Sequence, residues 1–104
     1  MVFPKSILIL GRRFEIIFKE EVILDGKVVG ATVDFHSMQI HVDPTMTDVN
    51  QWKSFFHEVV HIGLDVSGID QTLSSFAVEV ICQTLANTFY DLVMSFNDKK
   101  NFKK

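Results

Sequence analysis

The sequence contains one cysteine and no long apolar run, and each of these shortages excludes a class of protein. Cys82 has no second cysteine with which to form an internal disulfide, as is typical of a reducing compartment. No apolar stretch approaches the roughly 18 residues that a membrane-spanning helix needs. Residues 1–10 lack the length and the small-residue cleavage site of a signal peptide. We therefore expect a cytoplasmic protein without a membrane partner.

Positive charge is also scarce in this chain. The net charge is −3, because thirteen acidic residues outnumber ten basic ones. A nucleic-acid-binding surface needs a concentration of lysine and arginine, so we expect no nucleic-acid partner. Several of the lysines gather in residues 98–104, where they predict a frayed basic tail that complements the end of a helix.

Apolar residues are abundant: they make up 47% of the 104 residues and include ten phenylalanines. This is enough for the core of one domain spanning 1–104. Residues 1–43 have the alternation and turn signals of short strands, including Asp25-Gly26, and longer periodic segments follow. The order predicts an α+β fold. It consists of a small antiparallel sheet of three to four strands in 1–43 and two long, packed, antiparallel helices at 45–67 and 70–97.

The pentapeptide at positions 57–61 is His-Glu-Val-Val-His, the H-E-x-x-H pattern. On a helix, His57 and His61 lie on one face, where both imidazoles can bind a single Zn²⁺. Glu58 follows the first histidine by one residue and is therefore directed to the water that the metal activates, as a general base. The pattern thus predicts two zinc ligands and a base.

The motif needs a helix, and the surrounding residues predict one. Thr45, Thr47 and Asp48 each offer a side-chain oxygen as N-cap, and Ser67-Gly68 is a plausible stop. Apolar residues recur between them at helical spacing. They are Trp52, Phe55, Phe56, Val59, Ile62 and Val66.

A catalytic zinc site needs a third protein ligand and an open fourth position. Leu64 and Ser67 stand where a metzincin carries glycine and histidine, which excludes that class. Asp65 lies one turn beyond His61 and is an alternative ligand, although its displacement along the helix makes convergence poor. Asp70, in the following turn, is a weaker version of the same idea.

Glu79 is the best third ligand on physical grounds. It lies in a second predicted helix, at 72–97 with Asp70 or Thr72 as its cap, among apolar neighbours where a carboxylate favours a nearby cation. The apolar stripe of this helix has three- and four-residue spacing. It consists of Val78, Cys82, Leu85, Phe89, Leu92 and Phe96. Cys82 could ligate a metal as a thiolate, but its place in the stripe indicates a buried structural thiol.

These residues resemble the small gluzincin-type zinc metallopeptidases, notably the ImmA/IrrE-like proteins and related short phage-encoded proteins. The matching segments are residues 57–68, Glu79 with residues 85–90, and the strands at 30–35 and 39–42. The resemblance covers about residues 28–95. It implies a minimal zincin core, with His57, His61 and Glu79 as zinc ligands and Glu58 as general base.

Larger gluzincins carry a further side chain that stabilises the oxyanion, and this chain has no room for the subdomain that supplies it. Tyr90 is eleven residues beyond Glu79, back on the same face but about 16 Å along the helix, which we expect to be too far for this role. His36 and His41 are alternatives. The strand at 39–42 precedes the motif helix and can pair with an extended substrate, in which case His41 would face the cleft; a surface histidine is the plainer interpretation.

Two functions follow. The first is a zinc metallopeptidase with one Zn²⁺ per chain and a peptide or protein substrate. The second is a non-catalytic zinc protein, in which the metal is structural or the cleft only binds a partner. An interaction protein without metal is a weaker third possibility. The sequence leaves the substrate and the oligomeric state open.

Overall fold

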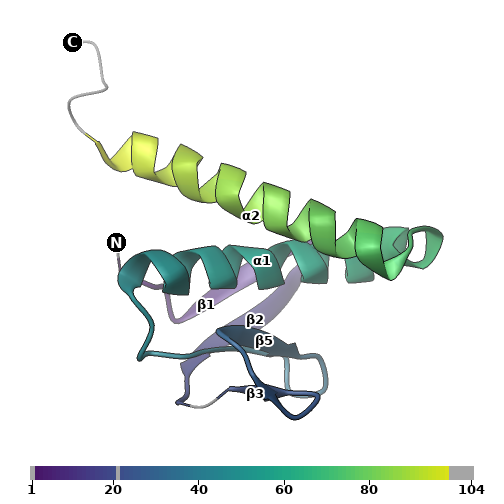
Figure 1. Ribbon diagram of the computed structural model, residues 1–104, viewed down its shortest axis with the longest axis horizontal. Helices are drawn as coiled ribbons and strands as arrows, with labels where there is room; N and C mark the ends of the chain where they lie inside the picture. The colour runs from purple at the N-terminus through teal and green to yellow at the C-terminus, as the bar shows by residue number, and fades with distance from the viewer. Residues whose placement is uncertain (1, 21, 99–104) are drawn as a thin grey trace.

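Six short strands precede two long helices in the computed structural model, which describes residues 2–20 and 22–98 (Figure 1). The expected α+β architecture, a small sheet followed by two packed helices, is confirmed. The basic tail expected at 98–104 lies, apart from Asp98, outside the described residues. The elements are β1 (Ser6–Ile9), β2 (Arg12–Phe18), β3 (Ile23–Leu24), β4 (Lys27–Val28), β5 (Ala31–Asp34), β6 (Gln39–Val42), α1 (Asp48–Ser67), the 3-10 helix η1 (Ile69–Thr72) and α2 (Ser75–Asn97).

The main sheet has four strands in the order β1-β2-β6-β5, and β3 and β4 form a separate hairpin. The pairs β1–β2 and β5–β6 are antiparallel, as expected of strands joined by tight turns. The pair β2–β6 is parallel, so the sheet is mixed and not wholly antiparallel. The long connection between these two strands lets β6 return in the same direction as β2.

The turn expected at Asp25-Gly26 joins β3 to β4. Both residues have positive φ, 51° and 77°, the combination that a two-residue hairpin turn requires. Leu10 and Gly11 adopt a similar pair of positive angles between β1 and β2, 48° and 80°. The residues at these two turns therefore determine where the chain reverses direction between the paired strands.

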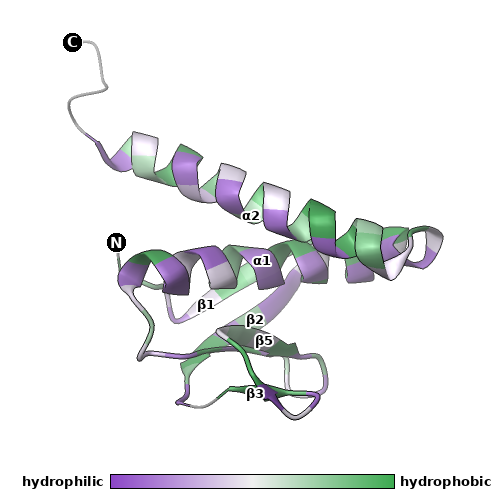
Figure 2. Cartoon of the chain, viewed as in Figure 1, coloured by the Kyte–Doolittle hydropathy of each residue, from purple (hydrophilic) through white to green (hydrophobic). Residues whose placement is uncertain are grey.

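The core lies between the sheet and one face of α1. Buried side chains from β2 and β6 meet the aromatic face of the helix, where Trp52 and Phe55 are 6% and 4% exposed. Phe3 stacks on Trp52 with a ring separation of 3.9 Å. Figure 2 shows hydrophilic and hydrophobic positions alternating along α1, as in an amphipathic helix. The apolar stripe of α1 thus holds the helix on the sheet and leaves its polar side outward.

The entry into α1 is held by side-chain hydrogen bonds. Asp43 Oδ1 accepts from the backbone N–H and the hydroxyl of Thr45, at 2.8 and 2.7 Å, and these bonds lower the pKa of Asp43. Of the three expected caps, Thr47 is the one used, accepting from the N–H of Asn50 at 3.3 Å. Gly68 ends the helix with φ 80°, a left-handed conformation that favours glycine.

The second helix begins later than expected. Residues 69–72 form η1, where the Thr72 hydroxyl donates to the carbonyl of Ile69, so neither Asp70 nor Thr72 caps α2. The cap is Ser74, which accepts from the N–H of Ala77. From there α2 runs back along α1, and the two helices diverge toward the end of α2 (Figure 1). None of the described helices is both long and apolar enough to cross a membrane.

Two glycines offer a matched test of this packing. A Cβ on Gly30 would lie 2.7 Å from Ser54 Oγ and 2.7 Å from Met46 Sδ, whereas one on Gly63 would meet nothing within 4 Å. We expect Gly30→Ala to lower the free energy of unfolding by about 1 kcal/mol, because the side chains of Met46 and Ser54 must be displaced. Gly63→Ala should raise it by about 0.5–1 kcal/mol through helix propensity. Urea unfolding measures both, and equal stability of the two variants would contradict the close approach at Gly30.

Candidate metal centre

Three side chains from two helices converge at one point. His57 and His61 project from adjacent turns of α1, and their Nε2 atoms lie 3.1 Å apart. Glu79, in the second turn of α2, reaches both rings: its Oε2 is 3.2 Å from His57 Nε2 and its Oε1 is 2.9 Å from His61 Nε2. The structure therefore brings together the three residues that the sequence suggested as zinc ligands.

The outer nitrogen of His57 is also occupied. Its Nδ1 lies 3.1 Å from Oε1 of Gln83, an acceptor one helical turn beyond Glu79. A hydrogen bond there places the proton of the neutral ring on Nδ1 and leaves the Nε2 lone pair facing the cluster. That lone pair faces a carboxylate oxygen, an arrangement that needs a proton or a cation between the two atoms.

The size of the cluster fits a zinc ion. Around a tetrahedral Zn²⁺ with bonds of about 2.0–2.1 Å, neighbouring ligand atoms lie roughly 3.3 Å apart. The three contacts here are 2.9, 3.1 and 3.2 Å, and the two that involve Glu79 use different carboxylate oxygens. A small expansion would therefore place an ion between the two imidazoles and either or both oxygens of Glu79. The side chain of Glu79 is 60% exposed and those of His57 and His61 are 19% and 27% exposed. One side of the cluster is thus open to solvent, as a catalytic metal site requires.

Cys82 lies on the inner side of the same cluster. One ligand atom each from His57, His61 and Cys82 lie within 4.8 Å of one another, close enough to hold a metal ion. The side chain is fully buried, and burial is the largest cause that raises the pKa of the thiol to about 11, with the charges of Glu79 and Glu58 adding to it. Without a metal, Cys82 is a neutral thiol.

Glu58 has the electrostatics of a proton acceptor that works near neutral pH. Its pKa is raised from 4.5 to about 7, first by burial and second by the negative charge of Glu79. Burial also lowers the pKa of His61, an effect that the charges of Glu79 and Asp70 oppose. The neutral imidazole is the form that binds a metal.

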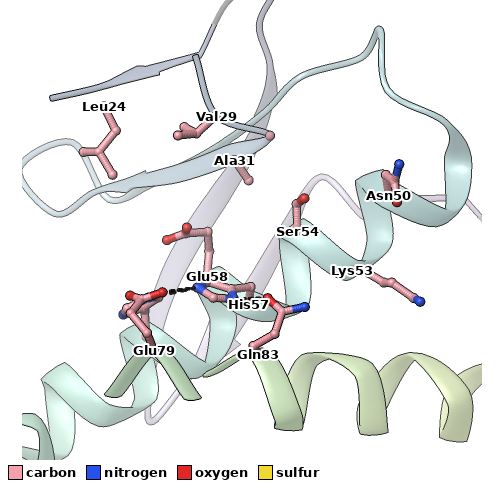
Figure 3. Close-up of a pocket in the computed structure, with 12 residues that line it drawn as sticks. Leu24, Val29, Ala31, Asn50, Lys53, Ser54, His57, Glu58, Glu79 and Gln83 are labelled. Carbon is pink, nitrogen blue, oxygen red and sulfur yellow. Dashed lines mark hydrogen bonds and ion pairs between the residues drawn. The ribbon is translucent and has the colours of Figure 1, made fainter. Parts of the chain in front are cut away.

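The cluster lies on the wall of a cleft of about 380 Å³. In Figure 3, Leu24, Val29 and Ala31 line one side, and the carboxylate of Glu58 points into the space between them and α1. Polar side chains of α1 and α2 line the other side. They are Asn50, Lys53, Ser54, His57, Glu58, His61, Glu79 and Gln83.

The edge strand of the sheet borders this cleft. The N–H of Asp43 donates to the carbonyl of Gly30 at 2.9 Å, which marks that pair as hydrogen-bonded in the β5–β6 ladder. Bonded and non-bonded pairs alternate in an antiparallel ladder. The backbone groups of Ala31 and Val33 therefore point away from β6, toward the open edge of β5.

Two positions expected near the cleft lie elsewhere. His41 is not on a free strand, because β6 is paired with β2 on one side and β5 on the other. Its neighbours Ile40 and Val42 face the core, so His41 faces the opposite side, where it contacts Gln39 at 3.0 Å. Tyr90 packs against the core cluster with Lys53 Nζ 5.4 Å from its ring centroid. Neither residue lines the cleft.

The remaining alternatives also lie outside the cleft. Asp65 is exposed near the end of α1, and the carbonyl that it contributes to the helix cap is its backbone group. His36 is exposed in the turn between β5 and β6. Asp70 lines a second, smaller cavity beside His61.

Several cleft residues were not among those expected from the sequence. Gln83 follows Glu79 by four residues, and Asn50 and Ser54 precede the motif at helical spacing, so periodicity could have identified them. Leu24 and Val29 come from the β3–β4 hairpin and the segment after it. No local pattern indicates that this hairpin lies over the site.

Comparison with protein-family models, with curated proteins and with solved structures finds no match to this chain. The functional argument therefore depends on the site itself.

The pKa of Glu58 predicts how the stability of the metal-free protein depends on pH. Its folded-state pKa of about 7 exceeds the ordinary 4.5, so the folded state binds more protons between these values and stability falls as pH rises through this window. Glu58→Gln removes the effect. In chelator, we expect the variant to match wild type near pH 4.5 and to exceed it by up to about 3 kcal/mol at pH 8.

Urea unfolding from pH 4.5 to 8 measures this difference. His61 titrates with the opposite sign, because its lowered pKa favours the neutral ring in the folded state, but it is present in both proteins. A difference between variant and wild type that does not change with pH would contradict the environment described for Glu58.

Proposed function

We propose that this chain is a zinc-dependent metallopeptidase that holds one Zn²⁺ through His57, His61 and Glu79. The observation that supports this most is the contact of Glu79 with both motif histidines, at 3.2 and 2.9 Å, on the solvent-exposed wall of a cleft. Two histidines on one helix, a glutamate from the next and an adjacent base are the groups of a catalytic zinc site. When bound, the ion would polarise the scissile carbonyl and make a water molecule more acidic.

Glu58 would act as the general base. It projects into the cleft beside the ligand cluster (Figure 3), where it can take a proton from the attacking water and pass it to the leaving amine. A cation held by the neighbouring residues would oppose the charge of Glu79 and favour the ionised form of Glu58. The base would then be ready at neutral pH.

The substrate we propose is an extended peptide or a flexible protein segment. The outward N–H and C=O groups of Ala31 and Val33 offer hydrogen bonds to a chain lying along β5. Such main-chain pairing tolerates many sequences. Any side-chain stabilisation of the developing oxyanion would come from donors on the cleft wall, such as Asn50 and Ser54, because His41 and Tyr90 lie outside it.

Cys82 supports a second candidate function, a non-catalytic zinc protein. A thiolate from Cys82 beside the histidines would complete four protein ligands and close the site, since a coordinating thiol loses its proton. The metal would then join α1 to α2 and leave no position for water. Glu79 is in direct contact with both rings, whereas Cys82 lies only within 4.8 Å, and we therefore favour the open site.

Metal content tests the ligand set. We expect about one zinc per wild-type chain after reconstitution, and a loss of at least tenfold in affinity for Glu79→Ala. Asp65→Ala, which removes an exposed acid on α1, is the matched control and should bind as wild type does. Zinc retained in Glu79→Ala but lost in Asp65→Ala would move the third ligand to Asp65.

Cobalt substitution of the same proteins separates the open and closed sites. A site without thiolate gives no sulfur-to-cobalt charge-transfer band, and Cys82→Ser should leave the spectrum unchanged. A charge-transfer band that disappears in Cys82→Ser would favour the closed, non-catalytic site.

Hydrolysis tests the base. The zinc-loaded wild type is incubated with a mixture of random-sequence peptides, and mass spectrometry should detect cleaved peptides. Glu58→Gln should keep the zinc and lose at least about 100-fold in rate, because a general base contributes 10²–10⁴. Chelator treatment of wild type is the control for metal dependence. Cleavage that survives in Glu58→Gln would show that the proposed base is wrong.

A further inference from the structure

The two motif histidines differ in how their outer nitrogens are held. Nδ1 of His57 is hydrogen-bonded to Gln83 at 3.1 Å. Nε2 of His61 contacts Glu79 and His57, but within the described part of the chain its Nδ1 has no hydrogen-bond partner. Metal-binding histidines nearly always donate their second N–H to a carboxylate, a carbonyl or a water molecule, which fixes the tautomer and the ring orientation. His61 therefore lacks a partner that His57 has.

An acceptor without a donor lies close by. Asp70, in η1, has a side-chain oxygen, Oδ1, that is buried and makes no hydrogen bond among the described residues. A buried carboxylate oxygen without a donor is costly, and such atoms are few in native structures. The residue is held in place by the turn that connects α1 to α2.

His61 and Asp70 line the same cavity, of about 300 Å³, and His61 also lines the main cleft. The donor without an acceptor and the acceptor without a donor thus belong to residues that border one space.

We infer that Asp70 is the positioning residue of His61: with the ion bound, its carboxylate accepts the Nδ1–H and keeps the Nε2 lone pair directed at the metal. Asp70 thus does for His61 what Gln83 does for His57. The inference depends on the proposed zinc site and adds a residue that does not itself bind the ion.

The same carboxylate could instead bind a cationic group of a substrate that enters the cavity. The burial of Oδ1 argues against this role, because a ligand from solvent cannot reach an oxygen that solvent does not reach. An internal donor such as His61 needs no such access. The test must therefore distinguish a role of Asp70 in positioning His61 from a role in binding substrate.

Zinc affinity, measured by competition with a chromogenic chelator, tests the inference. Asp70→Ala should weaken binding by about 10–100-fold. Asp70→Asn, which keeps a carbonyl oxygen as acceptor, should recover most of that loss. The control is Asp65→Ala, which removes an equal charge from an exposed position of α1 outside both cavities and should bind as wild type does. Far-UV circular dichroism verifies that each variant is folded.

A spectroscopic readout separates positioning from a general loss of stability. In zinc-loaded wild type and Asp70→Asn, the Nδ1 proton of His61 should give a slowly exchanging downfield NMR signal, and Asp70→Ala should lose it while the Nδ1 signal of His57 persists. Affinity in Asp70→Ala equal to that in Asp65→Ala, or a His61 signal that persists there, would overturn the inference and leave the zinc site intact. Absence of zinc from wild type would overturn both.

Discussion

The position of α1 between the sheet and α2 determines where each polar group of the site lies. One face of this helix carries Trp52, Phe55 and Ile62 into the core. A second face meets α2, where Val60 and Cys82 are buried outside that core. A third strip carries the polar side chains of the cleft, among them His57, His61 and Glu58. With both neighbouring faces committed to apolar contacts, the helix cannot rotate without exposing one of them, so the motif keeps a fixed orientation toward Glu79 and β5.

The same packing explains the electrostatics of the site. Glu58 is buried enough for its pKa to rise to about 7, while Glu79 remains largely in water and the cluster keeps an accessible side. Two carboxylates with such different surroundings suit different roles, one in proton transfer and one in binding a cation. In the metal-free state the lone pair of His57 and the carboxylate of Glu79 face each other without a compensating charge, which is the condition that a bound cation relieves.

Local chemistry made much of this structure predictable. Helical spacing located His57, His61 and Glu79, and the Asp25-Gly26 turn and the two strand hairpins followed from propensity. The failures share one physical cause, which is contact between segments distant in the chain. Nothing in the sequence of residues 39–42 indicates that β2 pairs with this strand. Because of that pairing the strand has no free edge for a substrate, and the interpretation of His41 as a residue facing the cleft depended on such an edge.

The surroundings of Tyr90 also depend on tertiary packing, because an aromatic residue on a helix can face a cleft or a core with the same spacing. Gln83, which contacts His57, was missed because it has no motif of its own. Asp70 is separated from His61 by a turn whose 3-10 geometry the sequence did not indicate.

Unlike α1, the second helix has almost no support from the sheet. Its extensive packing is with α1, and it leaves apolar side chains exposed along its length, from Phe76 at 79% to Leu92 at 50%. Segments with few buried contacts open at lower free energy than the domain as a whole. The ligand cluster lies near the start of this helix, where it joins the least supported element to the best supported one. Metal occupancy would thereby govern local opening of α2, and the concentration of free metal would set how often this half of the molecule is accessible to exchange or proteolysis.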